Sequence, residues 1–145
     1  FELVLDYLAV GLDPQRTTIF VQSQIPELAE LTIYFSMLAP LGQLQRNPTV
    51  KEEIKSAGLG KNISLGMLSY PVSQAADILL FMADAVPVGE DQLPHLELTR
   101  DIAKKFNRSY QSIFKIPQPI LGTCPRLMGL DGFQKMSKSR GNAIF

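Results

Sequence analysis

The stretch "AVPVGEDQ", residues 85–92, decides the fold class of this chain. A short apolar segment runs directly into Gly89 and an acidic pair, and an amphipathic, helix-like sequence follows up to Asn107. Strand, glycine and helix in this order favour a parallel α/β sheet, in which ligands bind beyond the carboxyl ends of the strands. Because Gly89 has no Cβ, a ligand could approach its backbone closely. On these residues alone, the simpler interpretation is the stronger one: Gly89 turns the chain and Asp91 caps the helix.

Apolar residues recur at helical spacing on both sides of this unit. The spacing predicts helices over residues 1–10, 26–44 and 64–85, the second of them broken near Pro40. Residues 17–22 are β-branched and aromatic, and they predict a short buried strand. The helix over 26–44 is too apolar for a free surface, which indicates either a core helix or a dimer interface.

The composition limits the class of protein. The chain has 145 residues, enough for one domain with its own core. Its 14 basic side chains balance its 14 acidic ones, so the net charge neither indicates nor excludes a nucleic-acid partner. Cys124 and His95 are single residues of their kinds, so we expect no internal disulfide, no metal site and a reducing, cytoplasmic compartment. No signal peptide or long apolar run is present, and we expect no membrane contact.

The stretch "YPVSQAADILL" places Tyr70, Gln74 and Asp77 on one stripe of a helix, because they are spaced by four and three residues. Apolar residues surround the aspartate, and a carboxylate buried without a donor is unstable. No basic residue lies three or four positions from Asp77, so the donor must come from elsewhere, for example from a ligand N–H or O–H. Exposure to solvent or a helix-capping role is an equally strong interpretation of this stretch.

The stretch "QKMSKS", residues 134–139, contains two lysines spaced by three residues, with Ser137 between them. Lys135 and Lys138 could act as point charges on a phosphate group, and flanking glycines would let the loop open and close. Most clusters of charged residues are simply solvated surface. The five-letter string KMSKS within this stretch is nevertheless far more specific than a lone glycine motif.

Together with "VPVGEDQ", "HLELTRDIAKKFN" and "YPVSQAADILL", the KMSKS motif resembles the bacterial-type tryptophanyl-tRNA synthetases of class I. The resemblance covers nearly the whole chain and implies a Rossmann-type α/β catalytic domain with flanking helices. It implies that tryptophan is activated by ATP, carrying Mg²⁺, and is then transferred to tRNA(Trp). It also implies a homodimer. The family's N-terminal His-x-Gly-His signature and an anticodon-binding domain are not found, so we expect residues 1–145 to form part of a single catalytic domain.

The resemblance also implies roles for individual residues. The ATP contacts would come from Gly89, Asp91, Lys135, Met136, Ser137 and Lys138, with Gly89 and Asp91 on the ribose. The catalytic charges would come from Lys135, Lys138, Ser137 and, by position, Lys51. The tryptophan pocket would be formed by Tyr70, Gln74, Asp77, Val86, Val88 and Gln92, with Asp77 accepting the indole N–H.

Gln74 departs from the family pattern, since many bacterial members have methionine at this position. The spacing of Tyr70, Gln74 and Asp77 is also similar to the side-chain pocket of some tyrosyl-tRNA synthetases, so a tyrosine enzyme is the first alternative. The second is a synthetase-like module without catalysis that binds nucleotide, RNA or protein. The stretches "VPVGEDQ" and "HLELTRD" favour the tryptophan enzyme over the tyrosine enzyme.

Overall fold

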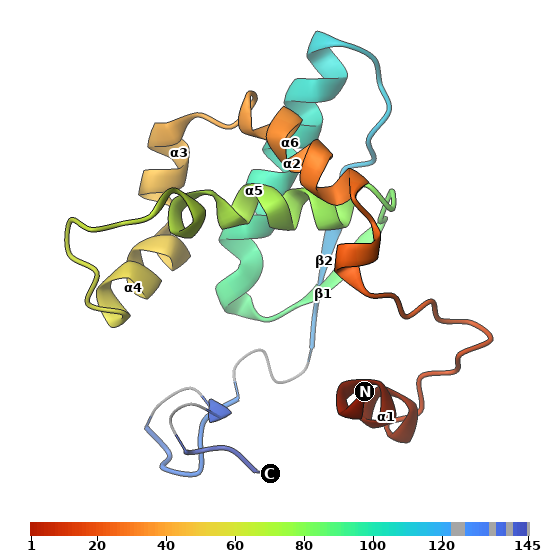
Figure 1. Cartoon of the computed structure of the whole chain (residues 1–145), viewed down its shortest axis with the longest axis vertical. Helices are drawn as coiled ribbons and strands as arrows, with labels where there is room; N and C mark the ends of the chain where they lie inside the picture. The colour runs from red at the N-terminus through yellow and green to blue at the C-terminus, as the bar shows by residue number, and fades with distance from the viewer. Residues whose placement is uncertain (123–126, 134–135, 139–140, 145) are drawn as a thin grey trace.

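The structure is a computed structural model that describes residues 1–122, 127–133, 136–138 and 141–144. Its core lies between three helices, α2 (Glu27–Ser36), α5 (Leu65–Leu79) and α6 (Leu93–Ser109) (Figure 1). The core side chains are all apolar: Leu28, Phe35, Leu44, Val72, Ala75, Ala76, Leu79, Leu98, Ile102 and Ala103. Burial of this apolar surface is the main force that holds the three helices together.

A two-stranded parallel sheet lies beside the helical core. Strand β1 (Ala85–Val88) pairs with β2 (Gln118–Leu121), and α6 connects them. The register places Val86 opposite Pro119 and Val88 opposite Leu121. The carboxyl ends of both strands point to the side of the molecule on which the C-terminal segment lies (Figure 1). This β1–α6–β2 unit confirms the predicted α/β class and the strand at 85–88.

The apolar stretch 26–44 forms two helices, as predicted, because Pro40 separates α2 from α3 (Leu41–Arg46). Only one side of α2 packs on the core: Phe35 is fully buried, whereas Ile33 and Met37 are 61% and 76% exposed. The sequence pattern did not distinguish the two sides, since both are apolar.

Side-chain caps define the starts of two further helices. The Asn47 Oδ1 accepts hydrogen bonds from the backbone N–H groups of Thr49 and Val50, and α4 (Pro48–Ser56) begins there. The Ser64 Oγ accepts from the Met67 N–H at 3.1 Å at the start of α5. Each cap satisfies N–H groups that the helix itself leaves unpaired.

The predicted buried strand at 17–22 was wrong. Residues 17–21 have no regular secondary structure, and Phe20 and Val21 are 46% and 59% exposed; a short 3-10 turn, η1 (Gln22–Gln24), follows. Phe20 packs against the ring of Phe81, with centroids 4.9 Å apart. A strand requires a hydrogen-bonding neighbour, and the described strands β1 and β2 pair with each other instead.

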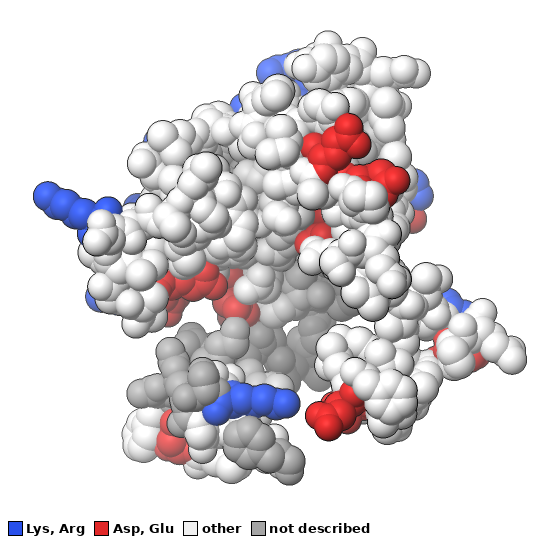
Figure 2. Space-filling model, in the orientation of Figure 1, with Lys and Arg blue, Asp and Glu red and all other residues white. Residues whose placement is uncertain are grey.

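Helix α1 (Glu2–Ala9) confirms the first predicted helix, and it has no buried residue. It lies apart from the core, on the same side as the C-terminal segment (Figure 1). Figure 2 shows charges of both signs scattered over a mostly neutral face. Within the described part of the chain, no helix is both long enough and apolar enough to cross a membrane.

Candidate functional site

The predicted stripe on α5 is present. Tyr70, Gln74 and Asp77 all lie on this helix and are half-buried. The middle member is tied to the turn after β1, because the Gln74 Nε2 donates to the Gln92 Oε1 at 3.4 Å. The Gln92 Nε2 in turn donates to the Asp91 Oδ2 at 3.0 Å. A chain of amide and carboxylate groups therefore links the α5 stripe to the 89–92 turn.

Asp77 has a donor that the sequence did not reveal. The Gln22 Nε2, from η1, donates to the Asp77 Oδ1 at 2.6 Å. The two residues are 55 positions apart, so no local pattern could have indicated the pair. Among the described residues, the structure gives the second oxygen, Oδ2, no hydrogen-bond partner. One oxygen of this carboxylate is thus held by the protein, and the other can accept a further donor.

The turn after β1 does not fit the simpler interpretation. Gly89 has φ −74° and ψ 161°, which any residue can adopt, so the backbone does not require glycine here. Asp91 lies in the 3-10 turn η2 (Glu90–Gln92), and no side-chain cap precedes either η2 or α6. The Asp91 carboxylate is exposed and bonds to Gln92 instead. The remaining reason for a glycine here is its missing side chain, which we expect to permit a close approach of a ligand to the backbone.

Val86 and Val88 lie on one face of β1, since side chains alternate along a strand. Both are half-buried, whereas Ala85 and Pro87, on the opposite face, are exposed. The more protected face of the strand therefore carries the two valines proposed for the amino-acid pocket.

The Tyr70 hydroxyl lies between two partners, the Glu53 Oε2 at 2.7 Å and the His95 Nε2 at 2.8 Å. Burial, followed by the hydrogen bond to Glu53, raises the pKa of Tyr70 well above its usual value, so the hydroxyl stays protonated. Burial lowers the pKa of His95, although the Glu53 and Asp91 carboxylates oppose that shift. His95 is fully buried, and both of its ring nitrogens lie beside protein partners, Asn47 and Tyr70.

Helix α4 brings the predicted Lys51 to the same region. The Thr49 Oγ1 on α4 donates to the backbone oxygen of Asp91 at 2.8 Å, which ties the helix to the 89–92 turn. Lys51 itself is exposed. Its position on a helix attached to the turn is compatible with a contact to a bound anion.

A buried asparagine, Asn142, holds Ser137 of the KMSKS motif. Its Oδ1 accepts from the Ser137 N–H at 2.8 Å, and its Nδ2 donates to the Asp131 Oδ2 at 2.8 Å. Met136 is bonded through its N–H to the backbone oxygen of Leu127. Lys138 is exposed, and Lys135 lies outside the described residues, as does Cys124. Asn142 was missed by the sequence analysis, although it follows the motif by only a few residues.

We expect Gly129→Ala to release Ser137 from Asn142. A methyl group at position 129 would overlap the Asn142 amide, which would have to leave its place. The segment would lose two hydrogen bonds worth about 1 kcal/mol each, so exchange of the Ser137 amide should accelerate by roughly tenfold or more. Hydrogen–deuterium exchange of the complete protein measures this. The matched control is Gly66→Ala, whose nearest neighbour atom would lie 4.0 Å away; equal exchange in both variants would contradict the assignment.

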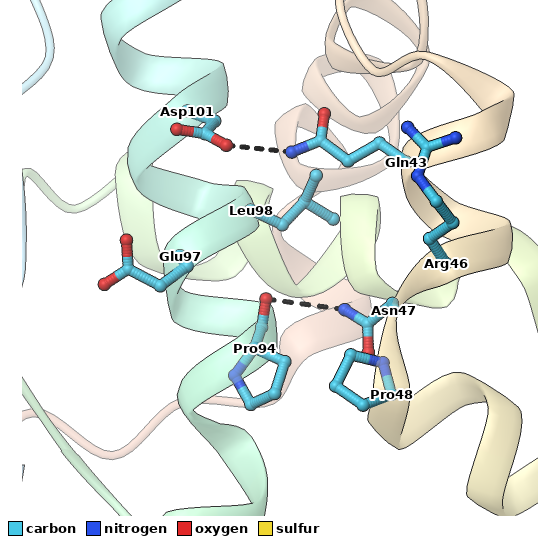
Figure 3. A pocket seen from close by; sticks show the side chains of 8 residues that line it. All are labelled: Gln43, Arg46, Asn47, Pro48, Pro94, Glu97, Leu98 and Asp101. Carbon is cyan, nitrogen blue, oxygen red and sulfur yellow. Dashed lines mark hydrogen bonds between the residues drawn. The ribbon is translucent and has the colours of Figure 1, made fainter.

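A cavity of about 300 Å³ lies elsewhere, between α3 and the first half of α6 (Figure 3). Two hydrogen bonds cross it, from Gln43 to Asp101 at 2.8 Å and from Asn47 to the Pro94 oxygen at 3.4 Å. None of the predicted site residues lines it. In the described ranges, no three His, Cys, Asp or Glu side chains lie close enough together to hold a metal ion.

Comparison with known proteins gives a consistent result. The family model described as "tRNA synthetases class I (W and Y)" matches residues 2–145. The tryptophan–tRNA ligase of Streptococcus mutans is 55% identical over 147 residues, covering 99% of this chain and 43% of that protein. The tryptophan–tRNA ligase of Treponema pallidum is 53% identical over 144 residues, covering 99% of this chain and 42% of that protein. The chain thus spans less than half the length of the curated relatives that it matches.

Solved structures give the same family. The tryptophanyl-tRNA synthetase of Campylobacter jejuni, complexed with ADP and tryptophan, superimposes with a TM-score of 0.81 and 41% identity, covering 95% of this chain and 42% of that chain. The Mycoplasma pneumoniae tryptophanyl-tRNA synthetase has a TM-score of 0.88 and 38% identity, covering 99% and 44%. These similarities confirm the predicted Rossmann-type fold class. With its βαβ unit, its α5 stripe and its KMSKS segment, the chain belongs to the class I tRNA synthetases for tryptophan and tyrosine.

Proposed function

We propose that the complete protein activates tryptophan with ATP and transfers it to tRNA(Trp). The observation that carries this proposal is the chain of hydrogen bonds from Gln74 through Gln92 to Asp91, which joins the amino-acid stripe of α5 to the turn after β1. An amino acid on α5 and a nucleotide at the 89–92 turn would lie next to each other. The relatives named above as tryptophan–tRNA ligases support this choice.

In the proposed reaction, the tryptophan carboxylate attacks the α-phosphorus of ATP, and pyrophosphate leaves. The protein contributes by positioning the two substrates and by stabilising negative charge on the leaving group. Gly89 and Asp91 would bind the ribose, and Gln92 the polar end of the amino acid. Lys138 and Lys135, with Ser137, would bind the phosphates, and Lys51 would approach them from α4.

Recognition of the amino-acid side chain falls to the other half of the site. The free oxygen of Asp77 would accept the indole N–H, and Val86 and Val88 would line the ring. Tyr70 would bound the pocket, and Gln74, already bonded to Gln92, would set its polarity. An amino acid that lacks an N–H at this place would bind more weakly, because it would leave the half-buried acceptor without a donor.

Several further properties follow from the same proposal. ATP would bring Mg²⁺ bound to its phosphates, since Mg²⁺ in proteins is commonly held by substrate phosphates and water.

The exposed apolar side of α2 and α3, formed by Ile33, Tyr34, Met37 and Leu41, would pair with a second copy in a homodimer. The compartment would be the cytoplasm, where translation uses charged tRNA.

The complete protein should exchange labelled pyrophosphate into ATP when tryptophan is added. Parallel assays with tryptophan, with tyrosine and without amino acid distinguish the alternatives. Exchange with tyrosine alone would identify a tyrosine enzyme. Absence of exchange with either amino acid would leave a module without catalysis, and the proposal would then be abandoned.

A further inference from the structure

A continuous line of hydrogen bonds runs through α4, α5 and α6, and the sequence analysis did not foresee it. It begins at Asn47, the cap of α4, passes through His95 of α6 and Tyr70 of α5, and ends at Glu53 on α4. Both ends thus lie on one helix, and the two middle members lie on the other two. Every member has its polar atoms within 3.3 Å of the next.

The direction of these bonds follows from the helix cap. The Asn47 Oδ1 accepts from the Thr49 and Val50 N–H groups at 3.0 and 3.3 Å, so this oxygen faces the start of α4. The Asn47 Nδ2, which can only donate, then lies 3.3 Å from the His95 Nδ1. The His95 Nδ1 must therefore accept, and it carries no proton.

A neutral imidazole has one donor and one acceptor nitrogen. With Nδ1 accepting, the His95 Nε2 carries the proton and donates to the Tyr70 hydroxyl oxygen at 2.8 Å. The single proton of that hydroxyl is then directed to the Glu53 Oε2 at 2.7 Å. A protonated ring would point a second N–H at the Asn47 amide, so the line of bonds specifies the neutral Nε2–H form.

These bonds matter because apolar packing holds α4 weakly. Val50 is the only buried residue of this helix. Three polar contacts attach it further: Asn47 to His95, Glu53 to Tyr70, and Thr49 to Asp91. The T-shaped contact between the rings of Tyr70 and His95, with centroids 5.2 Å apart, adds to this attachment.

We propose that His95 is a positioning residue that fixes the Tyr70 side chain and helix α4 relative to each other. This inference rests on the proposed function. It places His95 between two parts of the site: the amino-acid pocket, which Tyr70 bounds, and the phosphate side, which Lys51 approaches from α4. His95 touches neither substrate. It acts through the Tyr70 hydroxyl, and its effect should disappear when that hydroxyl is removed.

Two substitutions separate this role from simple packing. His95→Asn keeps an oxygen that can accept from Asn47 but is too short to donate to Tyr70. His95→Gln reaches further and keeps a donor for the Tyr70 hydroxyl. In the complete protein, we expect His95→Asn to raise the KM for tryptophan about tenfold, the equivalent of one hydrogen bond, with a smaller effect on kcat. The Gln variant should remain within about threefold of the wild type, since it retains that bond.

A double-mutant cycle with Tyr70→Phe tests whether His95 acts through the hydroxyl. In the Tyr70→Phe background, His95→Asn should change the KM for tryptophan by less than about twofold, because the bond is already absent. Additive effects, or equal losses in the Asn and Gln variants, would show that His95 only fills space and would overturn the proposal.

Nitrogen-15 NMR of histidine-labelled complete protein tests the line of bonds without any activity. The His95 signals are those that disappear in His95→Asn, and at neutral pH they should show a protonated Nε2 and a bare Nδ1. The opposite tautomer or a cationic ring would refute the inference even in an active enzyme. If the wild type exchanges pyrophosphate with tyrosine only, the amino-acid identity fails, and the same cycle is measured with tyrosine.

Discussion

Lys138→Ala is expected to lower the rate of tryptophan activation by about 100-fold, the scale for losing one donor to a transition state. Negative charge grows on the pyrophosphate as it leaves, and an ammonium group that follows this charge stabilises the transition state more than bound ATP. Lys138 is exposed, and the neighbouring Ser137 is held in place by Asn142. Single-turnover formation of the adenylate measures the rate, and ATP titration measures binding separately.

The matched control for Lys138 is Lys104→Ala, which removes an exposed lysine from α6 for which we propose no role. Its rate should stay within about twofold of the wild type, as for most surface substitutions. A rise in the KM for ATP with an unchanged kcat would mean that Lys138 binds the ground state and transition state equally. Unchanged turnover in Lys138→Ala would remove the segment from the catalytic mechanism.

Asp77→Ala should lower kcat/KM for tryptophan by roughly 100-fold, because a hydrogen bond to a charged, half-buried acceptor is lost. The Asp77 Oδ1 is occupied by Gln22 at 2.6 Å, which fixes the carboxylate in place. The other oxygen would receive the indole N–H. Pyrophosphate exchange at varied tryptophan concentration measures the loss, and ATP dependence should change little.

Gln22→Ala separates the two contacts of Asp77. This variant removes the internal donor but leaves the carboxylate, so we expect a loss of only about threefold, from less exact positioning. If Gln22→Ala were as damaging as Asp77→Ala, the internal hydrogen bond rather than indole recognition would explain both. A normal tryptophan dependence in Asp77→Ala would exclude this residue from the pocket.

The strand at 85–88 and the apolar segment at 17–22 show how far sequence patterns reach. Both are short, apolar and β-prone, yet only the first forms a strand. The strand at 85–88 pairs with residues 118–121. The intervening helix α6 brings these residues back beside it, as the crossover between two parallel strands requires. Residues 17–21 have no such partner in the described part of the sheet, so their intrinsic β-propensity has no effect.

The polar contacts of the site were predictable only in part. The stripe of Tyr70, Gln74 and Asp77 was visible because helical spacing is a local property. The partners were not visible: Gln22 for Asp77, and His95 and Glu53 for Tyr70, lie between 17 and 55 positions away. The sequence indicated that Asp77 needs a donor, but burial energetics alone cannot tell a protein amide from a ligand.

The sequence by itself determined the family, the periodicity of the helices, the break at Pro40 and the strand that ends just before Gly89. These features depend on residues that lie close together in the chain, or on motifs whose order of residues alone identifies the family. Only the tertiary structure decided which strand finds a neighbour, which side of α2 is buried, and which nitrogen of His95 carries its proton. Those outcomes depend on which distant segments the core brings together, because a buried polar group takes its donor or acceptor from whatever the packing places beside it.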